Sequence, residues 1–407
     1  MEPKALFRVL NYNGVKAKQL ESRFIDKQMP TVNITCSHRF LGFFHADKIK
    51  GRYKIMKKEL NFLKELSSLP GIPGNEKAVR NYLKEYVKPY ADSVETDNLG
   101  SLIAKKGQKG PHVMIAGHMD EIGLMVTQIT KDGFLKFQTV GGWFSQVMLA
   151  QEWEVHTNKG IIYGITGVKP PHIIPADKRK QAIEIDTMFI DIGVKDKDEA
   201  LELGVRIGDM IVPHTTFKVF GKGSYLMNKA WDNRIGSAVV AQALKQVSDF
   251  PNQLFGVFTV QEEVGLRGAK TSSYMVKPDI AIAVDTGLAN DVPGGDPVEQ
   301  SLGKGPQILF YDGGLIAHRA LREFVINVAK EENIPYQESY IVGGRTDAGH
   351  MHLAHHGAAA ISLCVPTRYM HSHTSIIHYE DYQNTIKLLV AVIKRLDQKT
   401  VEQILAD

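Results

Sequence analysis

The sequence contains only two cysteines, Cys36 and Cys364, among its 407 residues. Two cysteines are too few for a disulfide scaffold or a cysteine-rich metal site, so a reducing compartment is the default. The sequence also lacks a run of 18 apolar residues and an apolar segment near its first residue. We therefore expect a cytoplasmic protein with no membrane-spanning helix, no secretory signal and no membrane partner.

Several catalytic motifs are absent as well. The chain has no Gly-x-Ser-x-Gly elbow, no P-loop and no Gly-x-Gly-x-x-Gly after a strand. None of its 15 histidines is followed by Glu, so there is no His-Glu-x-x-His zinc helix. The sequence therefore gives no support for a serine nucleophile on an elbow, a nucleotide-binding loop or a zinc site on a helix.

Positive charge is concentrated in one part of the chain. Residues 1–55 hold 11 Lys/Arg and 4 Asp/Glu, whereas residues 56–407 hold 38 and 41. The main body therefore gives no charge signal for binding nucleic acid, and no such partner is expected. The leader, residues 1–55, has three interpretations: a flexible tail, a start assigned upstream of the real one at Met56, or a targeting peptide.

After residue 100 the pattern is that of an α/β fold. Near-continuous apolar runs are typical of strands that are covered on both faces, and helical stretches such as 236–247 and 318–334 alternate with them. We therefore expect a mixed, largely parallel sheet between layers of helices. The four runs are "HVMIAG" (112–117), "LFGVFTV" (254–260), "IAIAV" (280–284) and "AAAISLCV" (358–365).

Residues 122–213 differ in composition and hydrophobic pattern from the α/β part of the chain. They are rich in glycine and in short β-prone pieces separated by turn signals. This pattern predicts a small β-barrel-like domain inserted between strands of a catalytic α/β domain, which would comprise residues 56–121 and 214–407. Within the insert, "GGWF" and "PPH" are interpreted as a turn and a loop.

Each apolar run leads into polar side chains that can bind metal. Because active sites of open α/β sheets form beyond the carboxyl ends of the strands, these side chains are expected to meet. Two imidazoles and several carboxylates suit zinc, or cobalt and manganese, and so many acids need cations to neutralise them. Two metals would share one carboxylate. The residues after the runs are His118, Glu262, Glu263, Asp285 and His371. A further candidate is Asp232, which opens the segment "WDNRIG" before a helix.

Other histidines compete for these roles. His352 and His356 are spaced as neighbours on an expected helix and could bind metal, although histidines on a helix surface near a pocket are commoner. His373 follows His371 closely and could replace it, and we favour His371.

Six motifs together resemble the cocatalytic metallo-aminopeptidases of the glutamyl and tetrahedral aminopeptidase group. The resemblance runs from Met56 to the C-terminus with the motifs in the same order. The motifs are "GHMDEIG" (117–123), "KAWDNRIG" (229–236), "TVQEEVGLRGA" (259–269), "VDTG" (284–287), "TDAG" (346–349) and "TRYMHS" (367–372).

The resemblance implies a set of metal ligands. His118, Asp232 and Asp285 would hold one divalent ion, zinc or cobalt or else manganese. Asp232 would bridge to a second ion held by Glu263 and His371. It also implies that the peptide bond after Asp232 is cis.

The remaining roles follow from the same resemblance. Glu262 would be the general base and then the general acid, and Asp120 would orient His118. The inserted β domain would mediate dimerisation, and the dimers could build a twelve-subunit tetrahedron. Arg345 departs from the family, since relatives more often carry Gly there, and we expect it to bias the pocket toward an acidic N-terminal residue.

The sequence thus predicts a two-metal aminopeptidase that removes N-terminal residues from peptides. A metal-dependent deacylase, a carboxypeptidase or a glycanase on the same scaffold stays open. A glycanase needs two carboxylates free of metal, whereas the acids here are expected to bind metal. A non-catalytic binding protein of this fold would lack a ligand or the base, and all seven positions are filled.

Overall fold

The computed structural model describes residues 56–177, 179–295 and 300–407. The interpretations of the leader, residues 1–55, lie outside these described residues. Residues 59–407 form one compact unit. None of the helices in the described part of the chain is long and apolar enough to cross a membrane.

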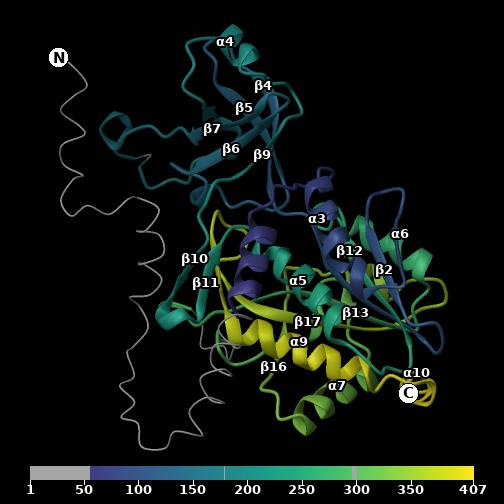
Figure 1. Cartoon of the computed structure of the whole chain (residues 1–407). Helices are drawn as coiled ribbons and strands as arrows, with labels where there is room; N and C mark the ends of the chain where they lie inside the picture. The colour runs from purple at the N-terminus through teal and green to yellow at the C-terminus, as the bar shows by residue number, and fades with distance from the viewer. Residues whose placement is uncertain (1–55, 178, 296–299) are drawn as a thin grey trace, which may run out of the picture. The chain divides into compact units, whose positions relative to one another are not determined.

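Four parallel strands form the centre of the large sheet, and they coincide with the four apolar runs. They lie side by side in the order β12 (Gln253–Thr259), β3 (His112–His118), β13 (Ile280–Leu288) and β17 (Ala359–Arg368). The register places Thr259 beside His118 at the ends of β12 and β3. The carboxyl ends of these strands therefore meet at one edge of the sheet (Figure 1).

Antiparallel strands flank this centre, and β14 and β16 form a further parallel pair. The expected mixed sheet is confirmed, with parallel pairing at its centre and antiparallel pairing at its flanks. The described residues give it twelve strands in all. The flanking strands are β1 (Ser93–Thr96), β2 (Leu102–Lys106), β10 (Lys218–Phe220), β11 (Tyr225–Asn228), β14 (Gln307–Asp312), β15 (Leu315–Ile316), β16 (Gln337–Tyr340) and β18 (Ser375–His378).

Helices cover both faces of the sheet, as strands buried on both sides require. Along β3, Val113 and Ile115 belong to the core on one face, and Met114 and Ala116 to the core on the other. A helix over 56–68 and α3, α5, α7, α9 and α10 line the first core, and α6 and α8 the second. These helices are α3 (Lys77–Val87), α5 (Trp231–Gln246), α6 (Arg267–Val276), α7 (Arg319–Glu331), α8 (Ala348–Met351), α9 (Tyr379–Ile393) and α10 (Gln398–Leu405).

A closed six-stranded barrel confirms the expected small β-barrel, and its strands fall within residues 122–213. Its interior is apolar and includes Leu124, Trp153 and Ile211, which are fully buried. The chain enters the barrel directly after the polar residues that follow β3 and leaves it toward β10 (Figure 1). The barrel strands are β4 (Gly123–Ile129), β5 (Leu135–Val140), β6 (Glu152–Thr157), β7 (Gly160–Thr166), β8 (Ile190–Asp191) and β9 (Met210–Pro213).

Candidate active site

His118, the last residue of β3, lies at the centre of a buried cluster of carboxylates. Its Nε2 atom is 3.2 Å from Asp232 Oδ1, 3.7 Å from Glu262 Oε2 and 3.9 Å from Asp285 Oδ1. Its Nδ1–H donates to the backbone carbonyl of Asp120 at 3.1 Å. Because that carbonyl can only accept, the hydrogen bond directs the Nε2 lone pair of the neutral ring toward the carboxylates.

Asp120 supports two other site residues through their backbone. Its Oδ1 accepts the backbone N–H of Glu262 and its Oδ2 that of Glu263, each at 3.1 Å. The same carboxylate lies 3.6 Å from His118 Nδ1. Asp120 therefore fixes the turn after β12 in addition to contacting His118, a role that the sequence did not suggest.

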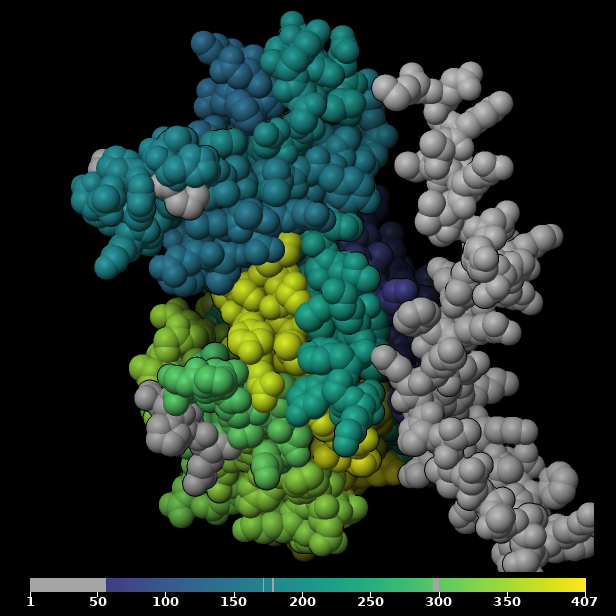
Figure 2. All heavy atoms as spheres, turned by 90° about the vertical axis from the view of Figure 1, so that its left-hand side faces the viewer, coloured from purple at the N-terminus to yellow at the C-terminus, as the bar shows by residue number. Residues whose placement is uncertain are grey.

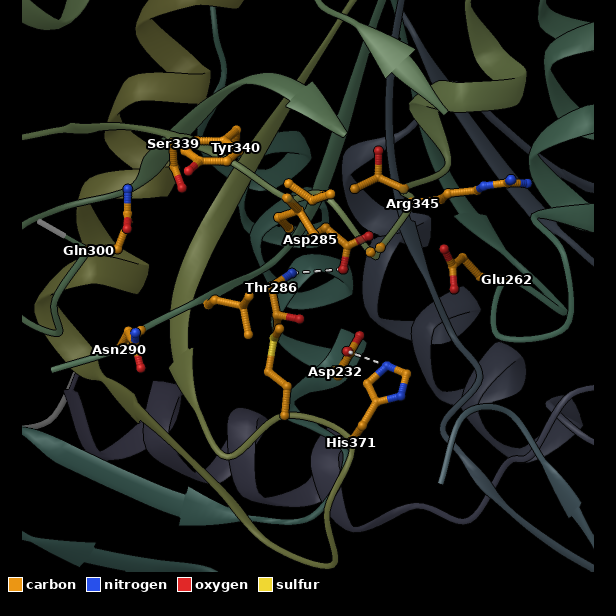
Figure 3. A pocket seen from close by; sticks show the side chains of 18 of the residues that line it. Asp232, Glu262, Asp285, Thr286, Asn290, Gln300, Ser339, Tyr340, Arg345 and His371 are labelled. Atoms are coloured by element: carbon orange, nitrogen blue, oxygen red, sulfur yellow. Dashed lines mark hydrogen bonds and ion pairs between the residues drawn. The ribbon is translucent and has the colours of Figure 1, made fainter. Parts of the chain in front are cut away.

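Asp232 stands where the chain enters α5 with an irregular backbone. Its peptide bond to Asn233 is cis, as predicted. Asn233 Nδ2–H donates to the carbonyl of Val284 at 2.9 Å, which ties this segment to β13 beside Asp285. The Asp232 carboxylate thereby reaches both imidazoles, with Oδ2 3.5 Å from His371 Nε2 (Figure 3).

The adjacent acids Glu262 and Glu263 point to different parts of the cluster. Glu262 Oε2 approaches His118, whereas Glu263 Oε2 lies 3.6 Å from His371 Nε2. Glu263 Oε1 is buried and has no hydrogen-bond partner in the described part of the chain. An unpartnered buried carboxylate oxygen is costly, and a cation at this point would satisfy it.

His371 lies in a loop and is the most exposed of these residues, with 43% of its side chain accessible. Its Nδ1–H donates to the carbonyl of Gly142 at 2.8 Å, and Gly142 belongs to the "GGWF" segment after β5. Figure 2 shows the yellow C-terminal segment directly against the blue segment that forms the barrel. The barrel therefore supports one imidazole of the site, although the sequence suggested only a turn there.

Burial and mutual repulsion raise the pKa of most of the acids. The pKa of Glu262 and that of Asp285 lie well above their ordinary values, and that of Glu263 rises to about 7. Although burial opposes it, the surrounding carboxylates raise the pKa of His118 well above its usual range. A bound cation would relieve this repulsion, so the donor set fits the metals expected from the sequence.

Asp347, from the "TDAG" segment, is a further buried acid whose role the sequence did not indicate. Its Oδ2 accepts the hydroxyl of Thr259, and its Oδ1 has no hydrogen-bond partner within the described residues. Burial raises the pKa of Asp347 to about 6, and its negative charge raises that of Glu262. It therefore contributes to the electrostatics around Glu262.

The competing histidines lie elsewhere. The helix expected to carry His352 and His356 ends at Met351, so their spacing does not place them on one helical face. His352 bonds the carbonyl of Ala348 at 3.0 Å instead. His373 is buried beside the carbonyl of His214 and packs edge-on against Trp153.

A pocket of about 650 Å³ opens beside the cluster. Its lining includes Glu262 and Arg345, and also Asn290, Gln300 and Tyr340. Figure 3 shows Arg345 and Glu262 toward one end of this pocket and the other three toward the opposite end. The volume suits one or two amino-acid residues of a peptide, within the usual range of ligand pockets.

The chain is similar to known aminopeptidases over most of its length. The M42 glutamyl aminopeptidase family matches residues 100–388. The lysyl aminopeptidase of Pyrococcus furiosus is 35% identical over 337 residues, which cover 82% of this chain and 96% of that protein. A TET aminopeptidase of a marine sediment Thaumarchaeota archaeon superposes with a TM-score of 0.83 at 45% identity, covering 86% of this chain and 99% of the other.

A second solved structure extends the comparison. The TET1 peptidase of Pyrococcus horikoshii, which can assemble into a tetrahedron or a large octahedral shell, superposes with a TM-score of 0.76. It is 34% identical, and the match covers 83% of this chain and 100% of that one. Fold, motif order and the extent of these matches lead to one conclusion: the chain belongs to the M42 glutamyl aminopeptidase family of peptide hydrolases.

Proposed function

We propose that this aminopeptidase uses two divalent metal ions and that Glu262 moves the protons of the reaction. The supporting observation is the convergence of two imidazoles and four carboxylates at the carboxyl ends of the central strands. Two groups in this cluster bring three potential ligand atoms to within 4.8 Å of one another. They are His118, Asp232 and Glu263, and His118, Glu262 and Asp285.

We assign His118, Asp232 and Asp285 to one metal, and Asp232, Glu263 and His371 to the other. When bound, the ions polarise the scissile carbonyl and lower the pKa of a water molecule. Zinc or cobalt suits this set of nitrogen and oxygen ligands, and manganese is a third choice. Neither group of potential ligands coincides with this assignment, because the first joins His118 to Glu263 and the second has Glu262 where the assignment has Asp232. The role of Glu262 as a base rather than a ligand therefore needs a direct test.

Glu262 has the surroundings that a proton carrier needs. Its side chain is buried at the pocket wall, and burial together with nearby acids raises its pKa. A carboxylate with a raised pKa can take a proton from the attacking water and return it to the leaving amine. Asp120 fixes its backbone at the end of β12 and thereby limits its movement.

Glu262→Gln and Glu263→Gln separate the two roles. Glutamine keeps the size and hydrogen bonding of glutamate but loses basicity and is a poor metal ligand. We expect the Glu262 variant to keep both metals and lose about 10²-fold or more in kcat. The Glu263 variant should lose metal, and added metal should restore part of its rate.

Metal counting and steady-state kinetics on aminoacyl-amide substrates decide this assignment. The metal-stripped protein is assayed after addition of zinc, cobalt or manganese, which also identifies the most active metal. If the Glu262 variant loses metal while the Glu263 variant keeps both ions, the assignment is reversed. If metal addition restores no amide turnover to the stripped native protein, a metal-dependent aminopeptidase mechanism is wrong.

We also propose that the protein forms homo-oligomers through the barrel, residues 122–213. On β7, Ile161, Tyr163 and Ile165 alternate on one face and are 50%, 61% and 44% exposed. Such an apolar face on a short strand is typical of a surface that is covered in an assembly. The tetrahedron or octahedral shell into which the Pyrococcus horikoshii TET1 peptidase can assemble supports the same idea.

Sizing of the native protein and of Tyr163→Glu tests the assembly. The native protein should elute as a multimer, and the glutamate should shift it toward smaller species. A native protein that elutes only as a monomer of 45.3 kDa at micromolar concentration would contradict the proposal.

A further inference from the structure

Arg345 is an exposed arginine that lines the pocket. It lies in the loop between β16 and α8, and its side chain is accessible. Within the described residues its guanidinium makes no hydrogen bond and no ion pair. Arginines near acidic clusters usually pair with one of the acids, so an unpaired guanidinium at a substrate pocket is available to a ligand.

The first part of the Arg345 side chain rests on a pair of glycines. A Cβ atom added to Gly313 or Gly314 would lie 3.4 Å or 3.6 Å from Arg345 Cγ. The neighbouring Gly344 carbonyl accepts the backbone N–H of Gly313 at 2.8 Å, which fixes this loop against the turn after β14. The alkyl part is thus supported while the guanidinium extends beyond it.

The guanidinium extends on the Glu262 side of the pocket (Figure 3). His350 lies near both of them. Burial lowers the pKa of its ring and the positive charges of Lys270 and Arg345 lower it further, whereas the backbone of Gly265 raises it. The N–H of Gly265 in turn donates to the carbonyl of Glu262 at 2.9 Å.

The opposite end of the pocket has a different character. Asn290, Gln300 and Tyr340 lie there, and the backbone N–H of Asn290 donates to the carbonyl of Gln300 at 3.1 Å. A peptide that enters the pocket has two ends to place, its N-terminal side chain and the residue whose nitrogen leaves. The two ends of the pocket therefore offer different chemistry to the two sides of the scissile bond.

We infer that Arg345 binds a carboxylate on the leaving-group side of the scissile bond. The inference rests on the proposed function, in which Glu262 returns a proton to the leaving nitrogen. The residue that carries this nitrogen must then lie beside Glu262, on the side where Arg345 extends. In a dipeptide a single carbon atom separates that nitrogen from the free carboxylate, so the long arginine side chain can reach it.

The carboxylate can come from two sources. One is the free C-terminus of a dipeptide, and the other is an Asp or Glu side chain in the second position of a longer peptide. Both present the same planar pair of oxygens to the guanidinium fork. This assignment differs from the expectation drawn from sequence alone, which placed Arg345 beside an acidic N-terminal residue.

Matched substrates on the metal-loaded full-length protein test the inference. The N-terminal residue is kept constant, and kcat/KM is compared for Leu-Ala and Leu-Ala-amide, and for Leu-Glu-amide and Leu-Gln-amide. For each pair, the ratio is the kcat/KM of the substrate that carries the carboxylate divided by that of its neutral partner. We expect Arg345→Gln to lower this ratio in at least one pair by about tenfold. The change should come mainly from KM, since a charge-assisted hydrogen bond to the substrate is lost. The pair that responds identifies the source of the carboxylate.

Three controls make the result specific. Arg345→Lys keeps the charge but loses the fork, so it should restore the ratio in part. Arg319→Gln removes an exposed arginine on α7 that pairs with Glu323, and it should leave both ratios unchanged. Raising the salt concentration should lower the preference of the native enzyme for the carboxylate, because the contact is exposed to solvent.

Two outcomes overturn the inference. One is that Arg345→Gln leaves both ratios as in the native enzyme. The other is that it changes only the ratio of glutamyl to leucyl anilide turnover, which would place the contact on the N-terminal side. If the native protein turns over none of these substrates, the proposed function fails, and calorimetric binding of Leu-Ala against Leu-Ala-amide still decides whether Arg345 recognises the carboxylate.

Discussion

The two imidazoles of the site are held by different kinds of structure. His118 ends a central strand and is 1% exposed, whereas His371 lies in a loop with 43% of its side chain exposed. The Nδ1–H of His118 donates to the carbonyl of Asp120, close in the sequence, and that of His371 to the carbonyl of Gly142 in the barrel segment. We refer to these as the strand half and the loop half of the site.

The two halves of the site therefore differ in how closely they are tied to the stability of the fold. The strand half is surrounded by buried groups that also hold the fold together, such as Glu121, Lys229 and Arg234. Lys229 Nζ contacts both carboxylate oxygens of Glu121 at 2.6 Å and 2.8 Å, and Arg234 contacts one of them at 3.3 Å. The loop half depends on a contact between the α/β body and the barrel, so it can change with little cost to the core.

Replacing each histidine by alanine gives the largest expected effect. His118→Ala and His371→Ala should each lower kcat/KM by at least about 10²-fold, because each removes a proposed metal ligand. Their effects on stability should differ. In the metal-stripped protein, His118→Ala should cost about 2–4 kcal/mol of unfolding free energy, since it leaves buried carboxylates without their cation.

His371→Ala should cost less than about 1 kcal/mol, as is usual for partly exposed ion pairs. Chemical denaturation after metal removal is the measurement, because bound metal would otherwise add its own stabilisation. Equal losses of stability in the two variants would contradict the distinction between the strand half and the loop half.

Asp120→Ala tests whether the strand half depends on its backbone contacts. The substitution leaves the buried N–H groups of Glu262 and Glu263 without their acceptor, so we expect a loss of about 2–3 kcal/mol in stability. Activity should fall by about 10- to 100-fold, the usual effect of removing a group that supports metal ligands. Thermal unfolding and steady-state kinetics give the two values.

Asp97→Ala is the matched control for this variant. Asp97 Oδ1 accepts three backbone N–H groups, from Leu99, Gly100 and Ser101, at 3.0, 2.7 and 2.8 Å, in the turn between β1 and β2. It should lose stability while kcat/KM stays within about twofold of the native value. If both variants lose activity to the same degree, the effect of Asp120 is general destabilisation.

The strand half could be predicted from sequence because sheet geometry places it. Once four apolar runs are assigned to neighbouring parallel strands, their ends must meet, and His118 and Asp285 come with them. The motifs of the resembling family then supplied the order of the remaining residues. The barrel could also be predicted, because residues after 122 are rich in glycine and in short β-prone pieces.

The loop half could not be predicted in the same way. The periodicity of apolar residues does not indicate that Gly142 and His371 are in contact, because loop contacts over such a sequence separation depend on tertiary packing. The same reason explains the wrong helix assignment at His352 and His356, where the helix ends at Met351. The side of the pocket on which Arg345 lies also required the structure, since its loop has no regular period.

Gly142→Ala tests the loop half directly, with a smaller expected effect. A Cβ atom at this position would lie 3.0 Å from His371 Nδ1, closer than an ordinary contact, so the ring must shift. We expect kcat/KM to fall by about tenfold and the affinity for metal to decrease, with little change in the melting temperature. A variant with native metal affinity and native kcat/KM would show that His371 does not need this support.

Trp143→Phe should give the smallest effect and shows how far the barrel controls His371. Trp143 follows Gly142, its Nε1–H donates to the carbonyl of Gly123 at 3.0 Å, and its ring lies 5.3 Å from that of Trp153. Phenylalanine retains a ring there but loses the hydrogen bond, a change of about 1 kcal/mol in stability. The looser loop should lower metal affinity and kcat/KM by about two- to threefold.

Phe134→Leu is the control, because it disturbs a different aromatic pair of the barrel, with Phe189 at 4.9 Å. It should lower stability without changing metal affinity. Equal metal affinity in the two variants would mean that the loop half is held by its own residues and that the barrel only adjoins it.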